Sequence, residues 1–339
     1  MTAQTAPVKP VSAPRRFWRE HETIIQLFVV TILIIAVMGW LSPSKFLRYY
    51  TFESITFTVP ELALLSVAIM IAMLTGGIDL SIIGIANLAA VLAGTLFHHM
   101  AASGQTAALG PAAVALGVVV ALGVGLVAGA LNGFLIAKVR ITPILATLGT
   151  SQLFTGLALV LTGGPAIVGF PRDWNFIGNG KLFGVAFPFL LFVTLAAAIG
   201  FVLSRTPFGT RLMLIGTNAK AAVFAGLKTE RIVFQSYVLT GLLASIAGLI
   251  LSGRTNAAKS DYGVSYLLEA VLVAVLGGTN PAGGRGSVLG VSIAVIALSL
   301  LSAGFQILRF SNFLIDFIWG GFLLLVIALN VLRAKQRGR

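Results

Sequence analysis

The stretch LTGGIDLSIIG, from Leu74 to Gly84, places a single carboxylate inside one of the most apolar parts of the chain. Between residues 62 and 97, Asp79 is the only side chain with a formal charge. Gly76 and Gly77 precede it, and paired glycines favour a turn over a continuous helix. We therefore expect one apolar helix to end before Asp79 and a second to begin just after it.

The apolar runs on either side of this stretch are long enough to cross a membrane. Hydrophobic residues make up 58% of the 339 residues and charged residues only 10%, whereas a soluble protein carries about 25% charged residues. The apolar residues gather in blocks of about 18 to 30, and about 20 residues of helix cross the hydrocarbon core of a bilayer. Backbone polar groups in lipid must bond internally, which helices achieve. The composition predicts an all-α, polytopic integral membrane protein.

The apolar blocks predict about ten transmembrane helices. The eighth is short, so a re-entrant or broken segment remains open there. The expected segments are 23–42, 56–74, 80–98, 109–137, 144–162, 182–203, 233–252, 264–277, 287–307 and 313–332.

The distribution of basic residues predicts the orientation of these segments. With the N-terminus inside, 16 of the 23 Lys and Arg residues fall on cytoplasmic segments and 7 on outside segments. Cytoplasmic loops of membrane proteins carry such an excess. We expect a cytoplasmic N-terminal tail (1–22), a transmembrane domain (23–332) and a cytoplasmic C-terminal tail (333–339). The first apolar run is longer than a typical signal-peptide core, which indicates a retained helix.

Small residues follow one face of the fourth segment. Gly117, Ala121, Gly125, Gly129 and Gly133 recur every four residues. Small side chains let helix backbones approach closely in a membrane. We expect this stripe to serve helix packing.

A candidate internal repeat surrounds two glycine-rich stretches. Each of the two parts is an apolar helix, then glycine pairs with polar residues, then a second apolar helix. One part begins at Leu64 and the other at Leu267. Transporters often contain such repeats, with broken helices near the repeat interface.

Asp79 is the leading candidate for a functional residue, because an ionisable group inside a membrane is costly. Asp79, helped by Ser81, fits a cap on the helix that follows, since a carboxylate accepts N–H bonds at a helix N-terminus. Substrate contact or ion coupling also remains open. Glu61 and Glu269 lie near the starts of apolar runs, where contact with water explains them, and Asp316 is the fourth ionisable candidate.

Uncharged polar residues also lie in or beside the apolar segments. They fit two roles, either interhelical hydrogen bonds or the lining of a path for a hydroxyl-rich solute. The residues concerned are Asn87, Asn132, Thr147 and Thr150.

The connector 204–231 differs from the others in length and charge. It holds five basic residues and the helix-compatible stretch AKAAVFAGLK. A short helix with one apolar side suits docking onto a cytoplasmic partner, and a helix lying on the membrane surface has a similar pattern. Both interpretations remain open from the residues alone.

No motif for catalysis or metal binding is present in the sequence. The chain has no cysteine, and it lacks a metal-binding histidine pair, a nucleophile elbow and a complete phosphate loop. We expect no enzyme activity, no catalytic residue, no metal site and no cofactor on this chain.

Four stretches together resemble the membrane permease subunits of bacterial ABC sugar importers. The resemblance is to the ribose, xylose, arabinose, rhamnose and autoinducer-2 group, and it runs from about residue 25 to 332 in the family's order and spacing. The four stretches are GGIDLS (76–81), LNGFLIAKVRITPILATLGT (131–150), FGTRLMLIGTNAKAAVFAGLKTERI (208–232) and AVLVAVLGGTNPAGGRGSVLG (270–290).

The resemblance implies a subunit of the bacterial inner membrane that works with partners. A periplasmic sugar-binding protein delivers a monosaccharide, a second permease copy or a related permease completes the path, and cytoplasmic ATP-binding subunits supply ATP and Mg. The stretch 208–232 matches the segment that contacts the ATPase. The matching positions are Gly216, Asn218, Ala221, Ala222 and Gly226.

The competing class is an ion-gradient-driven secondary transporter of a small polar solute. It predicts partnered carboxylates or basic residues at mid-membrane. Only Asp79 and Asp316 are candidates for that role, and a secondary transporter would have no function for the basic connector 204–231. The resemblance therefore makes the ABC permease the leading interpretation.

Overall fold

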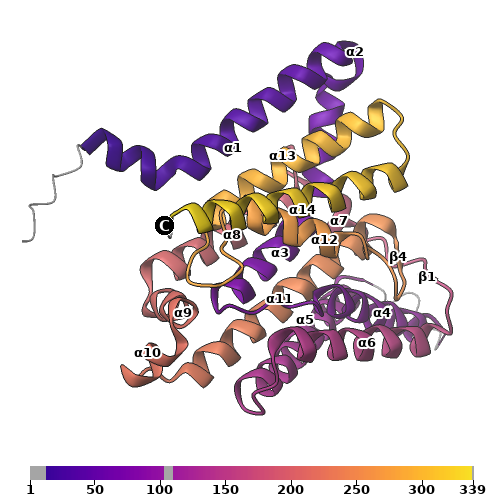
Figure 1. The fold of residues 1–339 in the computed structure, drawn as a ribbon. Helices are drawn as coiled ribbons and strands as arrows, with labels where there is room; N and C mark the ends of the chain where they lie inside the picture. Colours follow the sequence, from indigo (N-terminus) through magenta and orange to yellow (C-terminus); the bar gives the residue numbers. More distant parts are fainter. Residues whose placement is uncertain (1–12, 103–109, 338–339) are drawn as a thin grey trace, which may run out of the picture.

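The structure is a computed structural model that describes residues 13–102 and 110–337 (Figure 1). These residues are mostly helical, and β1 pairs with β4 and β2 with β3 in two small antiparallel ladders. The elements are α1 (Ala13–Leu41), α2 (Pro43–Phe46), α3 (Tyr49–Leu74), α4 (Ile82–Ala102), α5 (Pro111–Ala137), α6 (Pro143–Thr162), β1 (Ile167–Val168), α7 (Asn175–Asn179), β2 (Lys181–Leu182), β3 (Val185–Ala186), α8 (Phe187–Arg205), α9 (Pro207–Thr217), α10 (Ala219–Phe224), α11 (Thr229–Thr255), β4 (Ala257–Ala258), α12 (Tyr266–Leu276), α13 (Val288–Ile307) and α14 (Asn312–Arg337).

Eight helices in the described part of the chain are long and apolar enough to cross a membrane. They confirm the all-α polytopic fold, and they are α1 from Thr23 on, α3, α4, α5, α6, α8, α11 and α13. Two of the ten expected segments fall short of this measure. α12 has 11 residues and is therefore only about 16 Å long, because Gly277 and Gly278 end it early. The described apolar part of α14, Asn312–Val326, is also shorter than a full span.

Two helices begin earlier than their apolar runs predict. α1 begins at Ala13 and α3 at Tyr49, because polar residues before each apolar run continue the helix. α1 therefore takes in part of the expected tail 1–22, whose first twelve residues lie outside the described residues. The last two residues of the expected tail 333–339 lie outside them as well.

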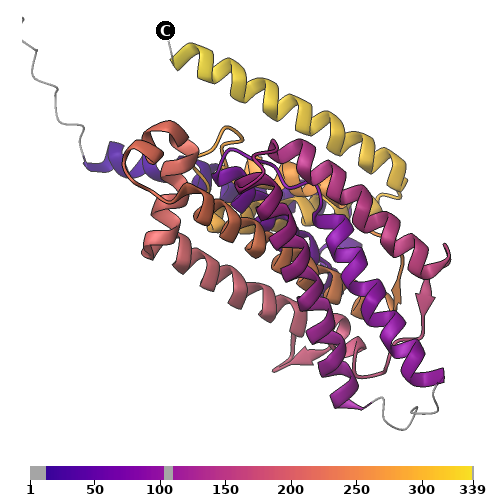
Figure 2. The ribbon, with the colours of Figure 1, turned by 90° about the horizontal axis from the view of Figure 1, so that it is seen from below.

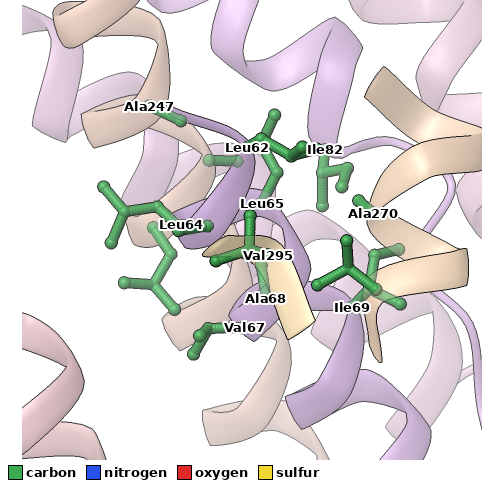
Figure 3. Close-up of a cluster of buried hydrophobic side chains, with 14 of the residues drawn as sticks. Leu62, Leu64, Leu65, Val67, Ala68, Ile69, Ile82, Ala247, Ala270 and Val295 are labelled. Atoms are coloured by element: carbon green, nitrogen blue, oxygen red, sulfur yellow. The ribbon is translucent and has the colours of Figure 1, made fainter. Parts of the chain in front are cut away.

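α3 is the central helix of the bundle. From Leu62 to Leu74 every side chain is buried, as expected for a helix that is apolar on all sides. Figure 3 shows its leucine, valine and isoleucine side chains against Ile82 of α4, Ala247 of α11, Ala270 of α12 and Val295 of α13. The stretch before the helix break is therefore the hydrophobic core itself.

α5 packs closely along α11 through its small residues. A Cβ added to Gly125 or Gly129 would clash with α11, at Ser245 and at Tyr237 respectively, and one at Gly133 would crowd Phe234. The interpretation of the stripe as a packing surface is confirmed. The α5–α11 pair gives the bundle a rigid wall beside the break.

The two ends of the bundle carry different elements (Figure 1). The start of α1, the end of α14, α9 and α10 lie at one end, which we call the α9–α10 end, and α2, β1 and β4 lie at the other, the α2 end. Figure 2, turned by 90°, shows α14 along one edge of the bundle. Exposed apolar side chains such as Phe313 and Phe317 cover α14, as expected for a face that meets lipid or a second subunit.

The two parts of the candidate internal repeat share one order of elements. α3, the loop 75–81 and α4 form one part, and α12, the loop 277–287 and α13 form the other. The helices differ in length, since α3 has 26 residues and α12 has 11. The two loops approach each other, because the N–H of Gly284 donates a hydrogen bond of 3.1 Å to the carbonyl of Leu74.

Candidate functional site

The helix break expected at LTGGIDLSIIG is present, deep in the bundle. α3 ends at Leu74, Gly76 adopts a left-handed φ of +81°, and α4 begins at Ile82. The break lies beside Thr240, close to the middle of the 27-residue helix α11. A change of chain direction at that depth requires every backbone and side-chain polar group nearby to find a partner inside the protein.

Asp79 is fully buried, and both of its carboxylate oxygens accept hydrogen bonds. Oδ1 accepts from the N–H of Ser81 at 3.0 Å and from its hydroxyl at 2.6 Å. Oδ2 accepts from the Thr240 hydroxyl at 2.7 Å. The carboxylate therefore closes the turn by binding Ser81 just before α4, and it links this turn to α11 through Thr240. Its partners are these two residues and not the backbone N–H groups of the first turn of α4, which begins at Ile82.

The side chains of Asn132 and Thr150 continue this chain of hydrogen bonds. The side-chain amide of Asn132 on α5 donates to the Ser81 hydroxyl at 2.7 Å. The hydroxyl of Thr150 on α6 donates to the Asn132 carbonyl oxygen at 2.6 Å. All four side chains are buried, so the line from Asp79 to Thr150 joins the break to two further helices.

Thr147 holds the backbone of the break from α6. Its hydroxyl accepts from the N–H of Leu80 at 3.1 Å. The hydroxyl hydrogen has two acceptors within reach, the Pro143 carbonyl at 2.8 Å and the Ile78 carbonyl at 3.1 Å. Backbone groups freed by the turn thus find partners in a side chain. We call Asp79, Ser81, Asn132, Thr147, Thr150 and Thr240 the break network.

The break network unites five of the six polar residues singled out from the sequence and adds Thr240. Thr240 was missed because it is one of several hydroxyl residues in α11, and nothing in the sequence distinguishes it from the others. Asn87 lies apart from the network. Its amide donates to the carbonyls of Ser260 and Tyr262, each at 2.9 Å, and so anchors the loop that follows β4 to α4.

The connector predicted at 204–231 forms the short helices α9 and α10. The Asn218 side chain caps α10 by accepting from the N–H of Ala221 at 3.0 Å. Gly226 follows α10 with a left-handed φ of +77° and open space around it, so its backbone conformation requires glycine. Ala222 is buried, while Ala221 is exposed. Asn218, Ala222 and Gly226 therefore shape the connector itself.

Gly216 lies where α9 meets both glycine-rich loops. A Cβ at Gly216 would clash with the carbonyl oxygen of Leu74 and with the backbone nitrogen of Gly284. Gly283 and Gly284 have left-handed φ angles of +98° and +80° and pack against Gly216 and Thr217. We call this contact the glycine junction. It joins the connector directly to the end of α3, a contact that the sequence did not predict.

α10 presents its largest apolar side chains to the outside. Phe224 is 92% exposed and Val223 is 57% exposed. Exposed aromatic side chains at a protein surface mark interaction sites. The connector thus has a buried side at the glycine junction and an exposed apolar side on α10.

A polar cavity of about 760 Å³ opens among α3, α12, α13 and α14, toward the α2 end. Hydroxyl and amide groups contribute much of its lining, including Ser54, Thr58, Ser299, Ser302, Gln306 and Asn312. Glu269 and Asp316 also line it, and the Ser265 hydroxyl donates to Asp316 at 3.2 Å. The cavity can hold a small solute that carries several hydroxyl groups.

Glu61 lies beside this cavity in a buried ion pair, so the expectation that water surrounds it is wrong. Its side chain is 1% exposed. Oε1 accepts from Nη2 of Arg254 at 2.7 Å and from the Tyr266 hydroxyl at 2.7 Å. Because Glu61 lies near the start of an apolar run, we expected its carboxylate to contact water. Instead, α11 and α12 cover the carboxylate and supply its partners.

Within residues 13–102 and 110–337, no group of three His, Cys, Asp or Glu side chains could hold a metal ion.

A helix that breaks inside an apolar bundle, with its polar groups bonded internally, is typical of membrane transport proteins. The comparisons with known proteins agree. The family described as "Branched-chain amino acid transport system / permease component" matches residues 51–327, and the chain belongs to this family. It is therefore a multi-pass membrane transport component.

The relatives confirm the resemblance to permeases of ABC sugar importers. The ribose import permease protein RbsC of Bacillus subtilis is 34% identical over 288 residues, which are 84% of this chain and 86% of RbsC. The autoinducer 2 import system permease protein LsrD of Yersinia pseudotuberculosis is 31% identical over 91% of both chains. LsrD of Salmonella typhimurium is 28% identical over 91% of this chain and 92% of its own length. None of the solved structures matches the chain.

Proposed function

We propose that the chain is the transmembrane permease subunit of a bacterial ABC importer for a monosaccharide. A periplasmic binding protein delivers the sugar and a separate cytoplasmic ATPase drives its passage. The observation that carries this proposal is the 34% identity to a ribose import permease along 84% of the chain.

The polar side chains that line the cavity can bind a neutral polyol. The cavity at the α2 end is lined by serine, threonine, glutamine and asparagine side chains together with basic and acidic ones. All of these form hydrogen bonds with hydroxyl groups. We place the outer mouth of the path at this cavity. The break network then lies deeper, where a change in the turn at Asp79 would open or close the path.

The α9–α10 end is the side that we assign to the cytoplasm. The exposed Phe224 of α10 suits a groove on the ATPase, and ATP and Mg belong to that partner. This orientation puts both chain ends in the cytoplasm and the protein in the inner membrane. A second permease copy or a related permease would cover one of the exposed apolar faces.

Coupling would run through the glycine junction. Gly216 touches the end of α3 and the loop 277–287 without intervening side chains. A displacement of α9 therefore acts on both glycine-rich loops at once, because a close-packed contact transmits motion directly. The break at Asp79 lies five residues beyond Leu74.

The competing secondary transporter has weaker support. Asp79 already accepts hydrogen bonds from Ser81 and Thr240, so its lone pairs are engaged by fixed protein donors. An ion carrier needs a carboxylate that exchanges its partners with the transported ion.

The proposal is tested in membrane vesicles that contain this chain, its candidate ATPase and its candidate binding protein. We expect uptake of labelled monosaccharide that requires ATP and the binding protein, with ribose the first to try. Uptake by this chain alone under an imposed ion gradient would instead support the secondary transporter. Variants of Phe224 test the contact with the ATPase more directly than variants of Gly216 or Ala222, because Phe224 is exposed and the other two positions are packed.

A further inference from the structure

A second hollow, which we call the basic groove, lies at the α9–α10 end between the end of α5 and the start of α11. Its volume is about 670 Å³. Phe134 of α5, Val223 of α10 and Phe234 of α11 form apolar walls, and Phe134 is half exposed. The outward face of α5 leads into it, with Val127 exposed a few residues earlier. The groove is thus continuous with an exposed apolar face of the membrane-spanning helix α5.

Basic side chains dominate the rim of the groove. Lys138, Arg140, Lys228 and Arg231 line it, and Glu230 is the single carboxylate among its lining residues. Nζ of Lys138 lies 3.3 Å from Glu230 and Nη2 of Arg140 lies 3.4 Å from it. None of the ion pairs in the described part of the chain includes Lys228 or Arg231. The rim therefore carries excess positive charge beside an apolar surface.

We propose that the basic groove binds an anionic phospholipid. The phosphate lies against Lys228 and Arg231, and one acyl chain lies along Phe134 and Phe234. An apolar floor open to the bilayer with a basic rim at its surface has the two features that such a lipid requires. This inference depends on the chain spanning a membrane and not on which solute it transports.

A protein partner would have a different requirement. A docked ATPase would cover the tip of α10 at Phe224, which is 92% exposed. Phe224 does not line the groove, which lies between α5 and α11 and reaches α10 only at Val223. A partner there would have to enter the headgroup layer. The charge of the rim complements a phosphate, and the apolar walls complement a hydrocarbon chain, so a lipid satisfies both.

The test is lipid retention by the full-length chain in detergent, measured by native mass spectrometry with equal amounts of phosphatidylglycerol and phosphatidylcholine. We expect the wild type to retain phosphatidylglycerol preferentially. Changing Lys228→Gln and Arg231→Gln together removes two basic side chains, each worth about fivefold, so the preference should fall about 25-fold. Arg211→Gln with Lys220→Gln is the matched control, because both residues are exposed on α9 and α10 and neither lines the groove.

Further measurements separate the lipid from other occupants. Excess glycerol 3-phosphate should leave the lipid in place, since it lacks the acyl chain that the apolar walls hold. Equal retention by wild type and the groove variant would overturn the proposal, as would an equal loss in the control. Loss of ATPase binding by the groove variant with unchanged lipid retention would assign the groove to the ATPase. Transport assays are not involved, so failure of the proposed function leaves this result interpretable.

Discussion

The hydroxyl of Thr240 donates a hydrogen bond of 2.7 Å to Oδ2 of Asp79, which lies 161 residues earlier in the chain. This contact ties the break between α3 and α4 to the middle of α11. The Tyr237 hydroxyl, one turn away on the same helix, is buried and has no hydrogen-bond partner in the described part of the chain. The Thr240 hydroxyl therefore bonds the break between α3 and α4, whereas the neighbouring Tyr237 hydroxyl does not.

This difference predicts unequal effects of removing the two hydroxyls. Thr240→Val should lower the free energy of unfolding by about 1.5–3 kcal/mol, the range for a buried hydrogen bond to a charged group. Tyr237→Phe removes a hydroxyl without a partner and should change it by less than about 1 kcal/mol. Thermal unfolding in detergent measures both. Equal losses in the two variants would show that the bond to Asp79 does not stabilise the break.

Substitutions at Asp79 separate its hydrogen bonds from its charge. Asp79→Asn keeps an oxygen that accepts from Ser81, and Thr240 can turn its hydroxyl to accept from the new amide. We expect assembly and much of the uptake to persist. Asp79→Leu removes the acceptor of the Ser81 N–H and of the Ser81 hydroxyl, each at a cost of about 1–3 kcal/mol. It also cuts the link to α11, because the Thr240 hydroxyl then bonds only the Tyr237 carbonyl of its own helix, so assembly or transport should be lost. Normal uptake by Asp79→Leu would contradict this role, and complete loss with Asp79→Asn would point to the charge itself.

The sequence predicted the break and most of its polar residues because each carries a local signal. Gly76, Gly77 and Asp79 stand out in an apolar run, and Asn132, Thr147 and Thr150 stand out for the same reason. Thr240 did not stand out, because α11 also carries Ser236, Ser245 and Ser252 and its sequence does not distinguish one hydroxyl from the others. Only the packing of α11 against the break shows its role.

Two other features depend on tertiary packing and were not predictable. Glu61 looked like a residue in contact with water, but its partners Arg254 and Tyr266 come from parts of the chain about 200 residues away. The glycine junction combines Gly216 with Leu74 and Gly284. Each glycine was visible in the sequence, but their meeting depends on how α9 folds back against the bundle.

The glycine junction predicts that Gly216 tolerates no side chain. Gly216→Ala places a methyl group against the Leu74 carbonyl and the Gly284 backbone, and overpacking of this kind costs about 1–3 kcal/mol. We expect a lower unfolding temperature and weaker coupling of ATP hydrolysis to uptake. Gly149→Ala is the control, because that glycine is also helical but has open space around it. If the two variants unfolded alike and both transported normally, the junction would have no role in coupling.

The buried pair of Glu61 and Arg254 predicts a large loss when one partner is removed. Arg254→Leu leaves the Glu61 carboxylate buried without a cation, which costs about 3–5 kcal/mol. Lys181 and Glu53 form the exposed counterpart, with Nζ 2.6 Å from Oε1 and the lysine 49% exposed. Lys181→Leu should cost no more than about 1 kcal/mol. Unfolding of both variants in detergent at constant salt is the measurement, and similar losses would mean that Glu61 is solvated in the membrane.

The exposed side chain of Phe224 at the tip of α10 predicts a loss of ATPase binding when it is changed. Phe224→Asp puts a charge where we expect an apolar groove of the ATPase, and loss of an aromatic anchor at the centre of an interface costs about 2 kcal/mol or more. Affinity for the purified ATPase should therefore fall at least about 30-fold, with the fold unchanged because the side chain is 92% exposed. Phe183→Asp is the matched control, since Phe183 is 94% exposed in the turn between β2 and β3, away from α10. Weakened ATPase binding by Phe183→Asp with normal binding by Phe224→Asp would reverse the proposed orientation of the two ends.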